Sequence, residues 1–410
     1  MKTFKPITIS LSPNTEKDDI SLAFKLLFLP WLWKKGRAVG ELELKLKEYI
    51  GTKYAFSFNS GRSSLLTLLR ALDFEKGSEV ILQAFTCNAA ANPIIWSGLI
   101  PVYADCDSNT FNIDFNGLEK KITPRTKALI VQHTFGLPAD MDKAVSFCQK
   151  NNLILIEDCA HSLGATFSGG KVGTFGKASY FSFSRDKIIS SVYGGMLVTD
   201  DSVLASKIEK IQNEMDLPKF CWIQQQLLHP VLTNRLILPI YRNIGKYLLV
   251  LLQSIGVLSK AVVSSEKVGK KPGYFPKRMP NALAILALNQ FKKIDRFATH
   301  RELIAQKYRR ALENTKFGLA LDLPQTYLRF TVKHQKAHEI IRYFWDRNIL
   351  IGDWYTTPLA PKDTRLDKFY YKGDCPRAEE LSKVTFNLPT HINISETDAD
   401  KIIGLLEPWK

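Results

Sequence analysis

The residue with the clearest chemical potential in this 410-residue chain is a lysine that follows an apolar segment. Lys187 stands just after the strand-like stretch 178–184, which is rich in aromatic residues. Desolvation lowers the pKa of a lysine amine and frees it as a nucleophile, so a lysine at a strand end is a candidate to form a Schiff base with a carbonyl compound. Most lysines are only solvated charges, so this position needs support from other residues.

A carboxylate and an imidazole follow a second apolar segment. Asp158 ends the stretch 153–158, and His161 comes shortly after it. Open α/β sheets bind ligands at the carboxyl ends of their strands. A carboxylate there can keep a pyridinium nitrogen protonated, and the imidazole can contact the ring. The alternative is an aspartate that caps a helix and a histidine with a structural role.

A turn that leads directly into a helical pattern could bind an anion. It consists of Ser60, Gly61 and Arg62. Backbone N–H groups at a helix start bind anions, glycine allows close approach, and arginine adds a charged contact. The alternative is a turn that only caps the helix.

Aromatic and thiol side chains follow another predicted strand. Phe85 and Cys87 stand at the end of the stretch 79–85 and could lie over the face of a ring. Taken with the lysine, the carboxylate and the anion-binding turn, they indicate a site for one phosphorylated, aromatic cofactor.

Alternating elements must position these residues. The expected strands are 79–85, 100–106, 127–135, 153–160, 178–184 and 195–200. Between them, residues 140–151 carry apolar side chains at helical spacing. This alternation predicts an α/β domain with a mainly parallel sheet between layers of helices.

The C-terminal part has a different pattern. Residues 281–314 read as one long helix that links two domains, and strand-like stretches at 327–333 and 349–355 follow it. We therefore divide the chain into an N-terminal arm (1–38), a large α/β domain (39–216), a basic amphipathic helical insertion (217–280), and a linking helix with a small C-terminal α+β domain (281–410).

Charge is concentrated in two segments. The chain has 56 Lys and Arg against 40 Asp and Glu, a net charge of +16, and its 45% hydrophobic content excludes a disordered chain. Residues 217–280 hold ten bases and a single acid, Glu266, and residues 1–37 hold seven bases and three acids. The rest of the chain has nearly equal numbers of basic and acidic residues, so the net charge of the protein says little about catalysis.

Cysteine usage and the apolar segments indicate the compartment. Six cysteines are scattered without a CxxC pair, which favours reduced thiols in a cytoplasmic protein and gives no metal site. The N-terminal residues lack the apolar core of a signal peptide. Residues 247–259 are shorter than the ~18 apolar residues of a membrane span.

The motifs also occur in one collinear order. They are 58–72, 77–86, 98–114, 122–142, 156–176, 180–187 and 194–199, with a closing stretch at 375–398. Together they resemble the DegT/DnrJ/StrS family of sugar aminotransferases, which are pyridoxal 5′-phosphate (PLP) enzymes of fold type I. The matches span about 39–200 and 279–408, which is most of the chain.

The resemblance implies a role for each residue. Lys187 would form the Schiff base with PLP, Asp158 would pair with the pyridine nitrogen, and His161 would lie close to the ring. Ring stacking would fall to Phe85 or be lost, because Cys87 stands where the family often has an aromatic residue. The phosphate would be held by Ser60, Gly61, Arg62 and Ser182.

The implied reaction is a transamination. An amino donor, usually glutamate in this family, would supply the amino group to a nucleotide-linked keto-sugar, in surface polysaccharide, lipopolysaccharide or secondary-metabolite biosynthesis. The resemblance also implies a homodimer with its sites at the subunit interface. The alternatives are a PLP-dependent sugar dehydratase, in which histidine replaces the lysine, and a non-catalytic scaffold at a membrane surface. Lys187 favours transamination.

Two further departures from the family pattern concern the surroundings of the site. Arg62 stands where the family usually has Thr, and Val192-Tyr193 precede Gly194-Gly195 in place of a Gly-Glu pair. The arginine still suits phosphate binding, whereas the Val192-Tyr193 loop helps to shape the site and so bears on the choice of substrate.

The basic insertion has two interpretations. It could be a helical hairpin at a dimer or domain interface. Alternatively, residues 217–272 and 24–35 could contact an anionic membrane, which would hold a cytoplasmic protein at the inner face of the membrane. No zinc-finger, RNP-type or recognition-helix motif is present, so we expect no nucleic acid partner.

Overall fold

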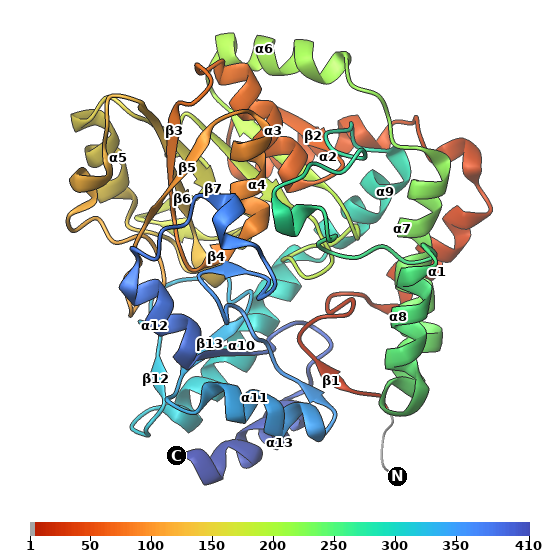
Figure 1. The fold of residues 1–410 in the computed structure, drawn as a ribbon. Helices are drawn as coiled ribbons and strands as arrows, with labels where there is room; N and C mark the ends of the chain where they lie inside the picture. The colour runs from red at the N-terminus through yellow and green to blue at the C-terminus, as the bar shows by residue number, and fades with distance from the viewer. Residues whose placement is uncertain (1–4) are drawn as a thin grey trace.

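A seven-stranded sheet forms the centre of the computed structural model, which describes residues 5–410 (Figure 1). The strands, in spatial order, are β2 (Tyr54–Phe58), β11 (Gly195–Thr199), β10 (Ala178–Ser182), β7 (Ile154–Asp158), β6 (Thr126–Gln132), β3 (Glu79–Gln83) and β5 (Ile100–Ala104). β11 is antiparallel to both of its neighbours, and the other pairs are parallel. The predicted mainly parallel sheet is confirmed, with β2 as an edge strand that the apolar pattern did not indicate.

Helices cover both faces of this sheet. Val80 and Leu82 of β3 pack with α3 (Gly61–Leu72), α4 (Asn88–Trp96) and α6 (Ser202–Asn213). Ile81, between them, points to the opposite face and packs with α5 (Met141–Lys150). Successive side chains of a strand point to opposite faces, so continuous apolar runs are what a sheet buried on both sides requires. On the α5 side, α2 (Ala38–Ile50) and α9 (Asn281–Phe291) extend the cover over β11.

The C-terminal part forms a small α+β layer, as predicted. Its antiparallel sheet has the order β12 (Gly318–Leu319), β13 (Phe330–Lys333) and β16 (Thr385–Leu388). The helices of this part are α10 (Ile294–Leu312), α11 (Ala337–Asp346), α12 (Pro376–Val384) and α13 (Glu396–Leu406). The sequence predicts one long helix over 281–314, but the structure has two helices there, α9 and α10, separated by residues 292–293.

Short strand pairs tie distant segments together. β15 (Leu359–Ala360) pairs in parallel with β4 (Thr86–Cys87), so the C-terminal part lies against the strand ends of the large sheet. β14 (Ile349–Leu350) pairs with β1 (Ile7–Thr8) and occupies only the start of the strand expected at 349–355. A small hairpin joins β8 (Thr166–Phe167) and β9 (Gly170–Lys171).

The segment expected as a helical insertion runs along one edge of the molecule, beside α1 (Lys17–Leu27) (Figure 1). Its regular helices are α7 (Phe220–Leu232) and α8 (Lys246–Ser254). Between them the chain makes π-helical turns at Thr233–Ile237 and Tyr241–Gly245 and a 3-10 turn at Leu238–Ile240. Pro239 lacks the N–H that a regular helix needs. Across residues 5–410, every helix is too short or too polar to cross a membrane.

Candidate active site

A cavity of about 120 Å³ opens where β7 and β10 end. Parallel strands present their carboxyl ends at one edge of a sheet, which is why residues far apart in sequence meet there. Eight of the nine predicted site residues line it: Ser60, Gly61, Arg62, Cys87, Asp158, His161, Ser182 and Lys187. The ninth, Phe85, does not.

One end of the cavity is built to hold an anion. Ser60 caps α3, and its Oγ accepts the Ser63 N–H at 3.0 Å. A Cβ on Gly61 would lie 3.1 Å from Cβ of Ser182, so glycine lets the helix start approach the end of β10 closely. The free N–H groups of α3 and the hydroxyls of Ser60 and Ser182 therefore face one small space, which suits a phosphate.

Arg62 lines this cavity, but its guanidinium is already occupied. Nη1 forms an ion pair with Glu266, and Nη2 donates to the Ala261 carbonyl oxygen at 3.1 Å. Both charged side chains are buried, with exposed fractions of 9% and 0%. Burial disfavours the charge of Arg62, but the Glu266 carboxylate raises its pKa above the ordinary arginine value. In the structure Arg62 therefore binds Glu266 and Ala261 of the basic segment, whereas the sequence predicted that it binds the phosphate.

Asp158 is a buried carboxylate at the base of the cavity, 4% exposed. It accepts the Ala160 N–H at 3.0 Å. Burial raises the pKa of Asp158, and the Tyr180 hydroxyl, the Ala160 amide and the Lys187 ammonium only partly oppose this. A cation placed against Asp158 would keep it ionised.

Lys187 reaches the cavity from the segment after β10. Its Nζ lies 5.1 Å from the ring centroid of Trp354. Burial lowers the pKa of Lys187, which favours the neutral, nucleophilic amine. Asn14, from the N-terminal arm, fixes the adjoining backbone by donating from Nδ2 to the Ile188 carbonyl oxygen at 2.9 Å. Arg301 in turn donates to Asn14 Oδ1 at 2.7 Å.

His161 is held between two aromatic rings. It stacks on Phe135 with centroids 6.0 Å apart and on Trp354 at 5.7 Å. Its Nδ1 accepts the Phe135 N–H at 3.3 Å, so the ring carries its proton on Nε2. Burial, followed by the nearby charges of Lys187 and Arg329, lowers the pKa of His161 well below its ordinary value, and the imidazole is neutral.

Phe85 lies outside the cavity. Its ring is fully buried and packs with Phe111, Phe135 and Tyr355, at centroid distances between 5.4 and 6.2 Å. The residue is in the left-handed region, φ 61°, and its side chain does not line the cavity. Cys87 does line the cavity, and its Sγ accepts the Ala89 N–H at 3.5 Å.

Sequence reasoning missed three residues of the C-terminal part. Trp354 and Tyr355 line the cavity just before β15, and the guanidinium of Arg329 lies 3.3 Å from the ring centroid of Trp354. Arg329 is 3% exposed and donates to Asp186 at 3.3 Å. The aromatic pair within 349–355 was a signal, but the stretch was read only as a strand.

The residues present fit PLP. The anion site suits its phosphate, Asp158 suits a protonated ring nitrogen, and the amine of Lys187 suits its aldehyde carbon. Tyr180 also lines the cavity, and its buried hydroxyl lies beside the Asp158 carboxylate, whose charge it helps to stabilise.

Comparisons with known proteins agree with this geometry. The model of the DegT/DnrJ/EryC1/StrS aminotransferase family matches residues 14–224 and 244–407. The chain is 30% identical to the spore coat polysaccharide biosynthesis protein SpsC of Bacillus subtilis, over 95% of this chain and 94% of that protein. It is 28% identical to a GDP-perosamine synthase of Caulobacter vibrioides, over 97% of this chain and 96% of that protein.

A solved structure shows the same fold. Helicobacter pylori PseC, an aminotransferase involved in the biosynthesis of pseudoaminic acid, superimposes with a TM-score of 0.76 at 24% identity, over 98% of this chain and 99% of that one. The chain therefore belongs to the DegT/DnrJ/EryC1/StrS aminotransferase family of PLP-dependent sugar aminotransferases.

Proposed function

We propose that the protein transfers an amino group from glutamate to a nucleotide-linked keto-sugar in the biosynthesis of a surface polysaccharide, a lipopolysaccharide or a secondary metabolite. The observation that carries this proposal is the placement of Lys187 and Asp158 in one cavity beside an anion site. The names of the two relatives, which refer to a GDP-sugar and to a spore coat polysaccharide, support the substrate class.

Each site residue has a defined task in this proposal. When bound, PLP supplies the electron sink that makes a proton on the amine-bearing carbon labile. The amine of Lys187 binds the cofactor and then moves that proton. Asp158 holds the proton on the ring nitrogen, and the start of α3 with Ser60 and Ser182 binds the phosphate. The neutral His161 and the ring of Trp354 exclude water from the same space.

Two alternatives keep the fold and change the chemistry. A sugar dehydratase of this type has histidine in place of the lysine, and the presence of Lys187 favours amino transfer. A scaffold without catalysis would not need a lysine with a lowered pKa, so the lowered pKa of Lys187 favours an enzyme.

The proposal is tested by incubating the purified protein with PLP, glutamate and a panel of nucleotide keto-sugars while measuring 2-oxoglutarate. We expect one 2-oxoglutarate per aminated sugar with at least one member of the panel. Formation of a dehydrated sugar without 2-oxoglutarate would favour the dehydratase. Absence of 2-oxoglutarate even in a single turnover with glutamate alone would contradict amino transfer from glutamate.

We also propose where the protein works: as a cytoplasmic homodimer that docks on an anionic membrane. The six cysteines, all within the described residues, are free thiols, which suits a reducing compartment. An apolar stripe with three- to four-residue spacing follows the outer face of the α8 edge. It comprises Leu236, Ile240, Ile244, Tyr247, Val250, Leu251 and Ile255, each at least 37% exposed.

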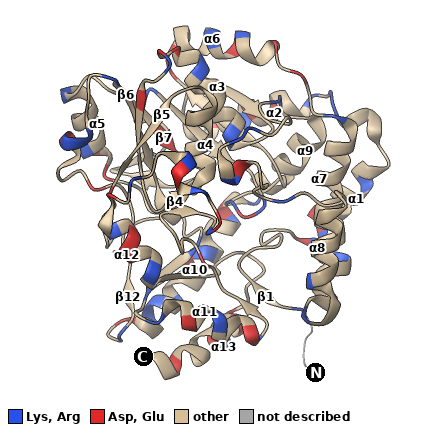
Figure 2. Cartoon of the chain, in the orientation of Figure 1, with Lys and Arg blue, Asp and Glu red and all other residues tan. Residues whose placement is uncertain are grey.

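The charge on this edge favours an anionic lipid surface as its partner. Exposed bases Arg235, Arg242 and Lys246 flank the stripe, and Figure 2 shows basic residues at the lower end of the α8 edge. Glu266, the single acid of residues 217–280, is buried and paired. Basic helices with an exposed apolar face bind at such surfaces.

Vesicle flotation distinguishes this contact from a subunit interface. We expect the protein to float with phosphatidylcholine–phosphatidylserine vesicles, and a variant with Ile244→Ser, Tyr247→Ser and Val250→Ser to stay unbound. The control replaces Val203, Leu303 and Leu321, exposed apolar residues elsewhere, with Ser. Failure of the unaltered protein to float, or conversion of the triple variant from dimer to monomer in light scattering, would overturn the membrane proposal.

A further inference from the structure

A second, larger cavity adjoins the one that fits PLP. It measures about 450 Å³ and shares lining residues with the first, among them Cys87, Arg185, Trp354 and Tyr355. A molecule in this outer cavity would therefore touch the reacting end of the site. The shared residues make the two cavities compartments of one site.

The basic segment supplies much of the outer cavity wall. His229 comes from α7, Gln253 from α8, residues 260–262 from the coil that follows, and Lys267 from the 3-10 turn Glu266–Val268. Residues 225–243, which include His229, fall between the two segments that match the family model, whereas the other wall residues of the basic segment lie in the second matched segment. His229 is therefore the wall residue that the family model does not account for.

Two residues that depart from the family pattern lock this wall in place. Arg62 forms the buried ion pair with Glu266, and Tyr193 donates from its hydroxyl to the Lys260 carbonyl oxygen at 2.7 Å. Both residues belong to the large domain and line the inner cavity. The departures thus have one common effect, which is to hold the basic segment over the site.

Buried hydrogen-bonding groups in the outer wall have no partner within residues 5–410. Both ring nitrogens of His229, which is 1% exposed, are unpaired, and so is Nε of Arg185. The other end of Arg185 is held by Ser259, whose hydroxyl donates to Gln226 Oε1 at 2.7 Å. Buried polar groups are almost always paired in native proteins, so these nitrogens indicate a ligand.

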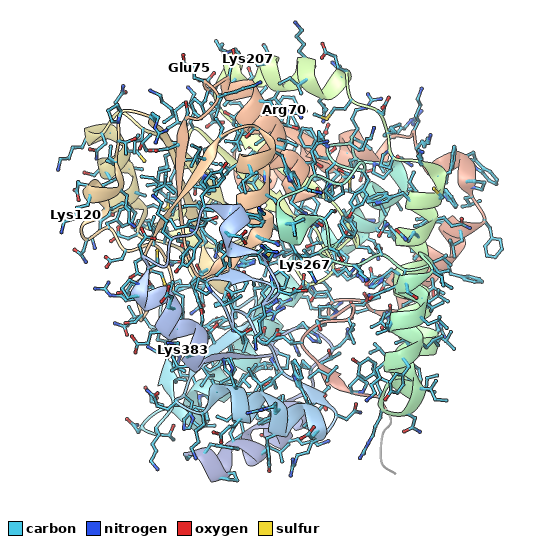
Figure 3. The ribbon with its side chains drawn as sticks, viewed as in Figure 1. Arg70, Glu75, Lys120, Lys207, Lys267 and Lys383 are labelled. Atoms are coloured by element: carbon cyan, nitrogen blue, oxygen red, sulfur yellow. The ribbon has the colours of Figure 1, made fainter. Side chains whose placement is uncertain are left out.

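The charge around these nitrogens favours an anion. Arg185 lines the outer cavity together with Lys260, Lys267 and Lys362. Within the described chain, Lys260 and Lys362 form no ion pair, whereas Lys267 pairs with Asp363. Figure 3 shows Lys267 near the centre of the view. Two acids, Asp186 and Asp353, also line the outer cavity, against four bases, and Asp186 is paired with Arg329.

We infer that the outer cavity binds the diphosphate of the nucleotide-linked acceptor, with His229 and Arg185 donating hydrogen bonds to it. The inference rests on the proposed function and names the part of the chain that selects its acceptor. At neutral pH the imidazole of His229 is uncharged, because burial and then the nearby Arg185 lower its pKa. It therefore has one N–H to donate, and Arg185 supplies the charge-assisted bond.

The test is calorimetric binding to the PLP-loaded full-length protein, with inorganic pyrophosphate, UDP, GDP and dTDP as probes. PLP occupies the inner anion site, so the probes report on the outer cavity. The variants are His229→Leu, which removes both nitrogens, and His229→Gln, which keeps a donor. The matched control is His338→Leu, an exposed histidine of α11 that lines neither cavity. Thermal unfolding confirms that each variant is folded.

We expect at least one probe to bind the unaltered protein, and His229→Leu to weaken it roughly 10- to 100-fold, the usual worth of a bond to a charged group. His229→Gln should recover most of the affinity, and the control should bind normally. Unchanged binding by His229→Leu, equal loss in His229→Gln, or no binding of any probe would overturn the inference. This binding assay contains no glutamate and does not depend on turnover. A failure of amino transfer would therefore show in the 2-oxoglutarate assay and could be told apart from a failure of diphosphate binding.

Discussion

The two walls of the site differ in origin and in what holds them. The strand-end wall, formed by Ser60, Asp158, His161, Ser182 and Lys187, stands on the large sheet and the start of α3. The insertion wall, formed by His229, Ala261 and Val262, comes from the basic segment. Apolar packing of Trp222, Ile223 and Leu227 and buried polar contacts such as the Arg62–Glu266 ion pair hold that segment against the large domain. The strand-end wall carries the groups for amino transfer, and the insertion wall faces the side where an acceptor would lie.

This difference shows how one scaffold can keep its chemistry and change its substrate. The groups that act on PLP sit at strand ends, where the backbone is fixed by the sheet. On the insertion wall, His229 lies in the stretch 225–243, which the family model does not match. Arg62 and Tyr193 are two of the residues through which the walls meet, together with Arg185, which donates to Ser259.

Breaking the contact between the walls should have the largest effect on stability. Glu266→Gln would leave the buried guanidinium of Arg62 without a counter-charge, and we expect the free energy of unfolding in urea to fall by about 3–5 kcal/mol. Replacing both residues with Met should recover most of this loss. Asp400→Asn, at an exposed ion pair with Lys307, is the control and should cost less than about 1 kcal/mol. A loss below about 1 kcal/mol in Glu266→Gln would show that the walls are not joined by this pair.

A change in the strand-end wall should affect turnover and leave stability intact. Asp158→Asn keeps the size of the side chain and removes the charge that would hold a proton on the ring nitrogen. We expect the rate of amino transfer to fall by about 10²- to 10³-fold, as for loss of one strong electrostatic contact. The free energy of unfolding should stay the same or rise, since the buried carboxylate is costly by itself. A variant with normal turnover would remove Asp158 from the proposed role.

Buried histidines on both walls should make stability fall in mild acid. His161 and His229 have pKa values well below the ordinary 6.5, and burial lowers the pKa of His391, in the C-terminal part, to about 3. The unfolded chain therefore binds these protons first as the pH falls, so stability is lost from about pH 6.5 downward. Each such group contributes up to about 1.4 kcal/mol per pH unit.

Urea unfolding between pH 7 and pH 5 measures how steeply the free energy of unfolding falls with pH. His391→Gln should reduce this slope by the contribution of one histidine. Within residues 5–410, the His391 imidazole hydrogen-bonds the backbone of Thr8 and Asn393 and lines neither cavity of the site, so this variant leaves the lining of the site unchanged. Stability that is constant or rises as the pH falls would contradict the buried, neutral state of the histidines.

The sequence allowed prediction of the strand-end wall because its signals are local. Asp158 and Lys187 directly follow apolar runs that can only be buried strands, and Ser60 precedes an apolar helix. The contacts of Arg62 could not be foreseen, since Glu266 is 204 positions away in the chain and its segment has no regular period. Likewise, nothing local to Phe85 indicates a left-handed backbone that turns its ring from the cavity.

The most direct test of the central assignment is to reduce the PLP-loaded protein with sodium borohydride and locate the cofactor by peptide mass spectrometry. We predict that the reduced cofactor is attached to Lys187, and that Lys187→Ala, although folded, shows neither the attachment nor the visible absorbance of the bound cofactor. Attachment to a different lysine, or visible absorbance that persists in Lys187→Ala, would contradict the assignment of this cavity as the PLP site.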